Sequence, residues 1–402
     1  MAKRITCDGG CMDKQQVNQT IRVQHIGKNH PIFDDRIFQK ECVSLAKAGY
    51  SVSYLTSDAV LSFKGERNGV QLRTLSGVKN PYRIRQFFSR FRYQREIKKR
   101  YLEEILAGEP DIVHIHEQYL GFLVKKLKKH AIRVIYDVHE DNVGNAGTYF
   151  RKRGALVSFW MSHRTRRRER RIVKTVDGVI TATDHIAELL MPDLKKKKWE
   201  VIYNYPNLEG VPFFPPTGKY SNYICYTGTM SHTRKLESTF EALAWLKKDI
   251  KILMLGNIEP WYREKLEAIY PNVEFCGYLD QEEIPSIHRG AFAGMCVLAN
   301  TPNIYYSLPV KMFEYMRDGI PVIATDFPIW RSIIEKSHCG ICVSDDAQAI
   351  GEAIDYLYTH QDIGRQMGEA GRKSAIENYN WKQEEKKLYK FYHAIMEGKN
   401  PS

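Results

Sequence analysis

Two charged residues in the C-terminal half, Lys311 and Glu314, are three positions apart and would share one face of a helix. They lie in segment 307–330, whose pattern predicts a helix with Ser307 as its N-cap and Gly319 at its end, followed by a strand. A helix start exposes unpaired backbone N–H groups and a positive dipole end, which suit a phosphate. Lys311 could then meet phosphates while Glu314 accepts hydrogen bonds from ribose hydroxyls. The alternative is a surface ion pair on an ordinary α/β helix.

Polar residues follow two buried strands that we predict at residues 111–116 and 134–139. They are His116, Glu117, His139, Glu140 and Asp141. Because ligands bind at the carboxyl ends of the strands in doubly wound folds, we expect these residues to converge on one cleft. The alternative is that each histidine has a structural role.

A third polar group follows Gly228, where a strand is expected to lead into a helix. Arg234 and Lys235 belong to this loop, which we expect to lie opposite the helix start at Ser307. A cationic loop that faces a helix N-terminus can clamp a diphosphate.

The elements that would position these residues alternate between strands and helices. In the N-terminal half, strands are predicted at residues 21–26, 51–55, 111–116, 134–139, 179–182 and 201–205. In the C-terminal half, they are predicted at residues 223–227, 251–255, 273–277, 294–298 and 321–325. This alternation is typical of an α/β protein with doubly wound parallel sheets, although the dinucleotide fingerprint G-x-G-x-x-G is missing from the first strand–helix turn.

A length of 402 residues suggests two domains. We divide the chain into a disordered lead segment at 1–20, an N-terminal domain at 21–207, a linker at 208–222 and a C-terminal domain at 223–380. The last predicted helix, 381–396, is amphipathic and no strand follows it, so we expect it to pack back onto the first domain.

The net charge of +13 favours an anionic partner. Two basic segments, 79–100 and 151–171, interleave Arg and Lys with Phe, Tyr or Trp, as is typical of proteins that lie on an anionic membrane surface. For the first segment a core helix and nucleic-acid binding are alternatives, but nucleic acid is not expected to be the main partner. Neither a membrane-spanning run nor an N-terminal signal is present, so the expected location is cytoplasmic, peripheral on the inner face of the plasma membrane.

The eight cysteines are scattered, and most lie in apolar runs, which indicates buried thiols in a reducing compartment. Cys339 and Cys342 have the spacing of a redox or metal pair. No second pair of ligands follows them, so a strand with two small buried residues is the preferred interpretation. We expect neither a metal nor a cofactor.

Taken in order, the motifs resemble those of the retaining, nucleotide-sugar-dependent glycosyltransferases of family 4. The motifs that carry the resemblance are HPIFDDRIFQKECVSLAKAGYSV, DIVHIHE, VIYDVHED, VDGVITATDHIAELL, the loop 228–236 and LPVKMFEYMRDGIPVIATDFPIWRSIIE. The resemblance extends over nearly all of residues 21–396. It implies the GT-B fold, in which two Rossmann-like domains face each other across a cleft, with the donor in the C-terminal domain and the acceptor in the N-terminal domain.

The resemblance also assigns roles to residues of the donor side. Glu314 matches the second glutamate of the family's E-x7-E motif, which holds the donor ribose, whereas the first glutamate would fall at Tyr306. The backbone amides of Ser307 and Leu308 match the loop that cradles the distal phosphate. Arg234 matches a diphosphate-binding lysine.

Other matched positions concern the rest of the cleft. Thr229 stands where the family often has a second cation, so Lys311 or Lys235 is expected to supply that charge. The segment that reads the base matches Cys276, Gly277 and Tyr278. His139 matches the histidine that contacts the donor sugar.

The implied activity is transfer of a hexose-type sugar, with retention, from a nucleotide-diphosphate sugar to a glycan or a polyprenyl-pyrophosphate-linked acceptor at the cytoplasmic membrane face. Front-face displacement would use His139, Arg234 and Lys311 as the catalytic residues. Two alternatives are a GT-B nucleotide-sugar 2-epimerase and a catalytically inactive GT-B subunit that binds a partner or a lipid.

Overall fold

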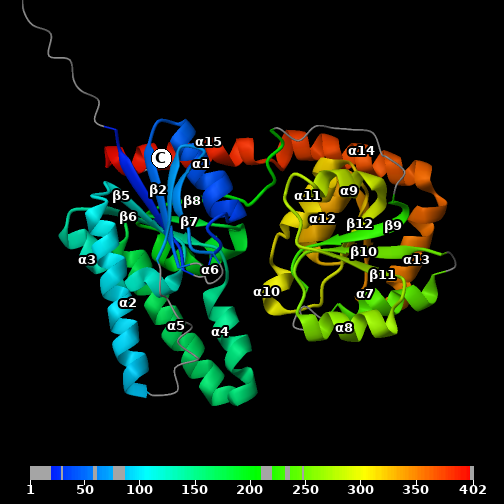
Figure 1. The fold of residues 1–402 in the computed structure, drawn as a ribbon, viewed down its shortest axis with the longest axis horizontal. Coiled ribbons are helices and arrows are strands. Elements are labelled where there is room, and N and C mark those ends of the chain that lie inside the picture. Colours follow the sequence, from blue (N-terminus) through cyan, green and yellow to red (C-terminus); the bar gives the residue numbers. More distant parts are fainter. Residues whose placement is uncertain are drawn as a thin grey trace, which may run out of the picture.

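The computed structural model describes residues 20–28, 30–57, 61–75, 87–209, 220–230, 236–246 and 249–398. Most of the lead segment 1–20 and of the linker 208–222 lies outside these ranges, as do Arg234 and Lys235. Two α/β domains lie side by side, each built around one twisted sheet (Figure 1). The predicted α/β class with two parallel-sheet domains is confirmed.

The first domain has an eight-stranded sheet in the order β3-β4-β2-β1-β5-β6-β7-β8. Its strands are β1 (Arg22–Ile26), β2 (Ser51–Thr56), β3 (Lys64–Arg67), β4 (Val70–Thr74), β5 (Ile112–Ile115), β6 (Arg133–Val138), β7 (Gly178–Thr181) and β8 (Lys198–Val201). All neighbours pair in parallel except β3 with β4. The hairpin of β3 and β4 was not among the predicted strands.

The second domain has a six-stranded parallel sheet in the order β11-β10-β9-β12-β13-β14. Its strands are β9 (Tyr220–Thr227), β10 (Lys251–Leu255), β11 (Val273–Gly277), β12 (Ala291–Cys296), β13 (Val322–Thr325) and β14 (Gly340–Val343). Because β9 begins at Tyr220, which pairs with Ala291, the end of the predicted linker 208–222 is wrong by three residues. Cys342 lies in β14, as expected for a strand.

Helices cover both faces of each sheet. In the first domain they are the π-helix η1 (Asp35–Cys42), α1 (Val43–Lys47), α2 (Phe87–Ala107), the short η3 (Gln118–Phe122), α3 (Val124–Lys129), α4 (Asn142–Phe150), η4 (Arg151–Arg153), α5 (Ala155–Thr175) and α6 (Asp184–Leu194). In the second they are α7 (Glu237–Glu241), η6 (Ala242–Trp245), α8 (Pro260–Ile269), α9 (Ile284–Gly290), α10 (Pro302–Tyr305), α11 (Val310–Asp318), α12 (Pro328–Ser337), α13 (Ala347–Thr359) and α14 (Gln361–Asn378). None of the helices in the described ranges is both long and apolar enough to cross a bilayer.

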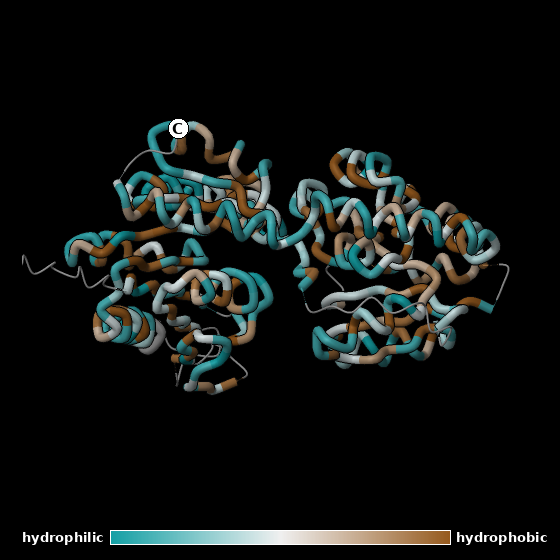
Figure 2. The backbone as a smooth tube through the Cα atoms, turned by 90° about the horizontal axis from the view of Figure 1, so that it is seen from above, coloured by the Kyte–Doolittle hydropathy of each residue, from teal (hydrophilic) through white to brown (hydrophobic). Residues whose placement is uncertain are grey.

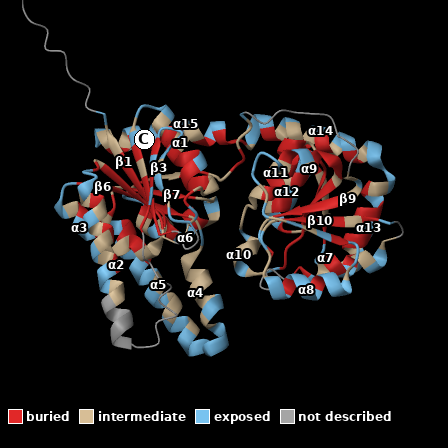
Figure 3. Ribbon diagram, in the orientation of Figure 1, coloured by how far each residue is buried: buried red, intermediate tan, exposed pale blue. Residues whose placement is uncertain are grey.

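Buried residues concentrate in the strands and on the inner faces of the helices (Figure 3). Helices α2, α4 and α5 extend well past the edge of the first sheet, and the far ends of α4 and α5 are largely exposed (Figures 1 and 3). Ile97 of α2 is 3% exposed and packs in the first core, so the core-helix alternative holds for this part of segment 79–100. Residues 79–86 lie outside the described residues.

The last helix, α15 (Trp381–Glu397), returns to the first domain, as predicted. Its Trp381 indole N–H donates to Ser44 Oγ at 2.9 Å, and the Tyr389 hydroxyl donates to the Ser44 carbonyl at 2.9 Å. Leu388 and Tyr392 are buried in a hydrophobic cluster of the first domain, separate from the cluster that contains Ile97. Seen from above, most of the outer helices alternate between hydrophilic and hydrophobic stretches, as expected for amphipathic helices with one buried face (Figure 2).

Two local predictions are wrong. The strand expected at 201–205 ends at Val201, because the Ile202 carbonyl accepts from Arg36 and the Tyr203 N–H donates to Glu384 instead of joining a neighbouring strand. Ser307 does not cap α11, since its hydroxyl donates to the Ile304 carbonyl of α10 at 2.9 Å.

Candidate functional site

A cavity of about 880 Å³ lies between the two domains at the carboxyl ends of both sheets. Six predicted site residues line it: His139, Gly228, Ser307, Leu308, Lys311 and Glu314. His139 follows β6 and Gly228 follows β9, whereas Ser307 and Leu308 precede α11 and Lys311 and Glu314 lie in its first turns. The expectation that the polar clusters share one cleft is therefore met for His139 and for the α11 segment.

The remaining predicted residues are elsewhere. Cys276, Gly277 and Tyr278, at the end of the edge strand β11, are not part of the cavity wall, and Tyr278 is 71% exposed. The Gly277 carbonyl accepts from the Gly256 N–H at 2.8 Å. Arg234 and Lys235 lie outside the described residues, so their roles stay predictions.

Lys311 is a buried cation in the C-terminal wall. Its side chain is almost covered, with 7% of the residue exposed, and Nζ lies 3.4 Å from the centre of the Tyr226 ring. Among the described residues, Nζ has no hydrogen-bond partner. The alternative of a surface ion pair between Lys311 and Glu314 is therefore wrong, because Lys311 is buried. A buried ammonium group without an anion is costly, and this one lies at a helix start, where an anion is favoured.

Glycines keep the backbone open beside this ammonium group. A Cβ on Gly228 would be 3.2 Å from Lys311 Nζ, and Gly228 has a φ of +127°. At the end of the next strand, a Cβ on Gly256 would come within 2.3 Å of the Gly228 carbonyl oxygen. The two strand ends can therefore approach each other only as glycines, which leaves room next to Lys311.

The segment before α11 is anchored on both sides. Ser307 donates its backbone N–H to the Ile304 carbonyl at 3.0 Å, and its own carbonyl accepts from the Trp330 indole at 2.7 Å. The Ser307 N–H is thus already hydrogen-bonded within the chain, and phosphate binding by this amide stays a prediction. The backbone N–H of Leu308 is the other predicted phosphate-binding amide in this segment.

Glu314 lies one turn into α11, on the same wall of the cavity as Lys311. Burial raises the pKa of its carboxyl group, and the nearby Arg317 opposes that shift. A half-buried carboxyl group in a polar cavity can accept hydrogen bonds from ligand hydroxyls.

On the opposite wall, His139 is held by a charged pair behind it. Its Nε2 lies 2.8 Å from Asp137 Oδ2, and Arg36 binds both oxygens of Asp137 at 3.1 and 3.2 Å. Burial alone would raise the pKa of Asp137, but Arg36 and His139 outweigh it and hold that pKa well below its usual value. An ionised Asp137 accepts a hydrogen bond from His139 when Nε2 carries the proton. Nδ1 is then the nitrogen of His139 that is available to a ligand.

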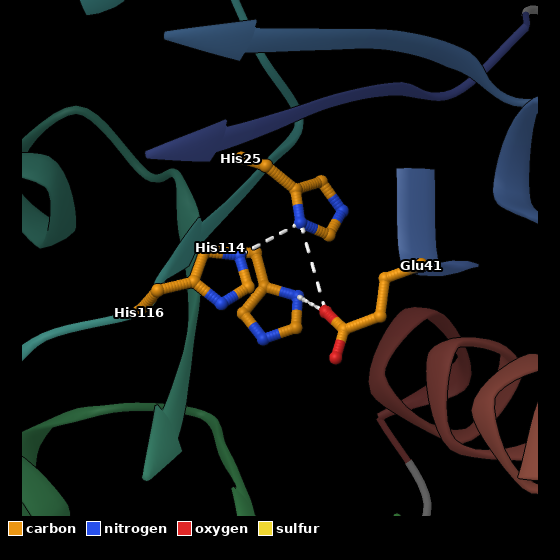
Figure 4. A group of neighbouring side chains, drawn as sticks. All are labelled: His25, Glu41, His114 and His116. Carbon is orange, nitrogen blue, oxygen red and sulfur yellow. Dashed lines mark hydrogen bonds and ion pairs between the residues drawn. The ribbon is translucent and has the colours of Figure 1, made fainter. Parts of the chain in front are cut away.

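Behind this wall lies a buried group that the sequence analysis did not identify in full. It consists of His25, Glu41, His114 and His116, whose side chains point toward one another (Figure 4). His25 is opposite His114 in the β1–β5 register, and His114 and His116 lie two positions apart, on one face of the sheet. The polar residues within apolar strands were the available signal, but pairing them needs the strand register.

Residues 40–209 match the family described as Glycosyltransferase Family 4, and residues 221–360 match the one described as Glycosyl transferases group 1. Two parallel-sheet domains with a cavity between them and a last helix that returns to the first domain have the arrangement of the GT-B fold, as predicted. Both matched families are glycosyltransferases, as the motifs predicted, and the match to family 4 extends over residues 40–209.

Two curated relatives match part of the chain. The putative glycosyltransferase EpsD of Bacillus subtilis (strain 168) is 26% identical over 159 residues, which is 38% of this chain and 40% of that protein. Phosphatidyl-myo-inositol mannosyltransferase of Mycobacterium leprae (strain TN) is 23% identical over 197 residues, which is 47% of this chain and 50% of that protein. The matches thus span half or less of these relatives.

Solved structures share the fold over the whole chain. Sucrose-phosphate synthase from Thermosynechococcus elongatus has a TM-score of 0.75 at 18% identity and covers 94% of this chain and 100% of its own. Anabaena HepE in complex with UDP and glucose has a TM-score of 0.68 at 11% identity and covers 93% and 100%. WaaG, involved in lipopolysaccharide biosynthesis, has a TM-score of 0.65 at 13% identity and covers 92% and 99%. At these identities the likeness concerns the fold alone.

Proposed function

We propose that the protein is a retaining glycosyltransferase that moves a hexose-type sugar from a nucleotide-diphosphate sugar to a glycan or a lipid-linked acceptor at an anionic membrane surface. The observation that carries the donor assignment is Lys311, a buried ammonium group at the start of α11 that forms no hydrogen bond with a described residue. A diphosphate supplies the negative charge that this position lacks. The complexes of Anabaena HepE with UDP and with UDP-glucose support a donor of this kind.

In this proposal each wall of the cavity has one task. Lys311 and the α11 N-terminus stabilise the charge that develops on the leaving diphosphate, which is usually the largest contribution a protein makes to such a step. Arg234 is proposed as a second cation. Glu314 holds the ribose, and His139, fixed by Asp137, positions the sugar from the opposite domain. In a front-face displacement the leaving oxygen accepts the proton of the acceptor hydroxyl, so the new bond forms on the side from which the diphosphate departs.

A donor panel tests the activity. The purified protein is incubated with UDP-, GDP- and ADP-sugars, with and without a membrane extract from the source cells, and free nucleoside diphosphate is measured by chromatography. If the protein transfers sugar, one donor should release nucleoside diphosphate, and this release should increase when the extract is added. NMR should show that an α-linked donor gives an α-linked product. An inverted anomeric centre would overturn retention, and no release with any donor would favour the inactive binding subunit.

The proposed membrane contact rests on the ends of α4 and α5. Four large apolar side chains there are strongly exposed: Leu156 (85%), Phe159 (73%), Tyr149 (67%) and Trp160 (58%). Basic residues surround them, and Arg153 and Arg164 lie over the Phe150 and Trp160 rings at 5.4 and 5.5 Å. Aromatic side chains that enter the headgroup layer beside cations favour an anionic bilayer.

Vesicle co-sedimentation tests this contact. We expect binding to vesicles with phosphatidylglycerol, little binding to pure phosphatidylcholine, and loss of most binding in the double variant Phe159→Ser, Trp160→Ser. Trp261→Ser is the matched control, because Trp261 is a similarly exposed tryptophan (52%) in the other domain. Equal binding to both kinds of vesicle, or equal losses in the two variants, would contradict a membrane contact at α4 and α5.

A further inference from the structure

We propose that His25, Glu41, His114 and His116 form a zinc site beneath the cleft of this protein. The four residues are fully or almost fully buried, with exposed fractions of 0, 0, 0 and 2%. One possible ligand atom from each residue lies within 4.8 Å of those of the other three. Three imidazoles and one carboxylate are a donor set that suits zinc.

Three separate elements bring these ligands together. His25 is in β1, His114 is in β5, and His116 follows β5 directly, so that the central strands of the sheet supply the imidazoles. Glu41 comes from η1, which packs over this face of the sheet. The π-helical geometry of η1 is notable because π-helical turns are frequent at functional sites. An ion at this point would join the sheet to the helix that borders the cleft.

The distances around Glu41 fit two ligands of one ion better than hydrogen bonds. Glu41 Oε2 is 3.9 Å from His25 Nδ1 and 3.9 Å from His114 Nδ1, too far for a hydrogen bond. Two ligand atoms of a tetrahedral zinc ion, each about 2.1 Å from it, are about 3.4 Å apart. His25 Nδ1 and His116 Nε2 are closer, at 2.9 Å. To bind one zinc ion, these two nitrogens would have to move apart by about 0.5 Å.

Unpaired atoms point the same way. Glu41 Oε2 and His114 Nε2 are buried and form no hydrogen bond with a described residue. The other atoms of these two groups are engaged, because Glu41 Oε1 lies 3.0 Å from Arg36 Nε and His114 Nδ1 lies 2.8 Å from the Tyr392 hydroxyl. A buried polar atom without a partner is costly, and a metal ion would provide one.

Outer contacts that orient metal ligands are also in place. His116 Nδ1 lies 3.5 Å from Asp137 Oδ2, and His25 Nε2 lies 3.3 Å from the Tyr392 hydroxyl. Arg36 Nε is 3.0 Å from Glu41 Oε1, which turns the other oxygen of that carboxylate toward the histidines. Ligating histidines and carboxylates are normally held in this way. With four protein ligands and no exposed position, the site has the closed character of a structural zinc site.

Metal content is the direct test. The full chain is produced without a histidine tag, passed through gel filtration and analysed for metals by mass spectrometry. After removal of metal with a chelator, zinc and cobalt(II) are titrated back. We expect close to one zinc ion per chain, a cobalt spectrum of tetrahedral type, and a higher melting temperature when zinc is restored.

Variants place the ion. Glu41→Gln and His114→Gln should each lower zinc affinity by at least about tenfold to a hundredfold. Substitution of a residue that only contacts a metal ligand already has an effect of this size. His130→Gln is the matched control, because His130 is exposed at the end of α3 and should bind zinc as the parent protein does. Circular dichroism shows whether each variant is folded. Failure of the parent protein to take up zinc in the titration, or unchanged affinity in folded Glu41→Gln, would overturn the proposal in favour of a network held by hydrogen bonds and protons alone.

Discussion

His185 of α6 and Tyr306 stack face to face across the cleft, with ring centroids 3.9 Å apart and planes inclined by only 11°. A second contact between the domains joins Gln281 Nε2 to Asp35 Oδ1 at 3.1 Å. Tyr306 is the residue that stands where the motif of the family has its first glutamate. At this position the chain therefore has an aromatic bridge between the domains in place of a carboxylate.

Removal of this bridge should open the cleft. An aromatic pair contributes about 0.5–1.5 kcal/mol beyond its buried area, which is enough to shift a balance between open and closed domains. Tyr306→Ala and His185→Ala should both increase the radius of gyration of the donor-free protein in small-angle X-ray scattering. Tyr356→Ala is the control, because Tyr356 stacks on His360 at 4.4 Å within one domain. Scattering curves that coincide for all three variants would contradict a bridging role.

Lys311→Met should separate catalysis from stability. Loss of a cation that contacts the leaving group lowers kcat by about a hundredfold. The melting temperature should not fall, because the substitution removes a buried, unpaired ammonium group and keeps the length of the side chain. Steady-state kinetics at saturating donor and differential scanning calorimetry measure the two effects. Lys336→Met, on the exposed side of α12, is the control, and an unchanged kcat in Lys311→Met would refute the leaving-group role.

Glu314→Ala should act on donor binding rather than on turnover. If Glu314 holds the ribose equally in the ground state and the transition state, its loss raises the donor KM and leaves kcat nearly unchanged. Nucleoside diphosphate affinity, measured by calorimetry, should fall in parallel, because the ribose contact does not depend on the sugar. A normal KM would show that the ribose contact is wrong.

The stability of the loop that follows β1 should depend on pH through His30. Its Nδ1 lies 3.2 Å from Asp34 Oδ2 and its Nε2 lies 3.0 Å from Glu117 Oε1. Burial would lower the pKa of His30, but the two carboxylates outweigh it and raise that pKa to about 10. Burial would likewise raise the pKa of Asp34, but His30 holds it down at about 2.

Two pH windows follow from these pKa values. A raised histidine pKa stabilises the fold fully below the ordinary value of 6.5, and this contribution is lost as the pH rises toward 10. A lowered aspartate pKa stabilises it above the ordinary value of 3.8, and this is lost as the pH falls toward 2. In urea unfolding, the parent protein should therefore lose its advantage over His30→Gln between pH 6.5 and pH 10. A constant difference across that range would refute the charged His30.

Much of the fold could be predicted because its strands are short apolar runs that end in polar residues. Apolar runs at 251–255 and 273–277 became β10 and β11 with the predicted bounds. The β3–β4 hairpin was missed, since β3 has almost no apolar residues and is exposed at the sheet edge. Segment 201–205 has strand composition, but it follows the edge strand β8 and its backbone is bound by the side chains of Arg36 and Glu384.

The candidate site was predictable where one helix carries it, and less so where it depends on tertiary contacts. Lys311 and Glu314 share a face by spacing alone, but the burial of Lys311 depends on Tyr226 and Gly228. The availability of the Ser307 amide depended on the short helix α10, which no periodicity indicates. In the same way, Glu41 reads as an ordinary helical glutamate until η1 is placed against the sheet.

The return of α15 to the first domain has a consequence for synthesis. Trp381 bonds to Ser44, 337 positions earlier in the chain, and Tyr392 closes the core over His114 at 2.8 Å. Domains generally fold in order as they leave the ribosome, the first one first. Here the first domain lacks part of its core until the second has been translated. Its nascent form must therefore remain competent to fold while the second domain is made, and the domain that starts to fold first is completed last.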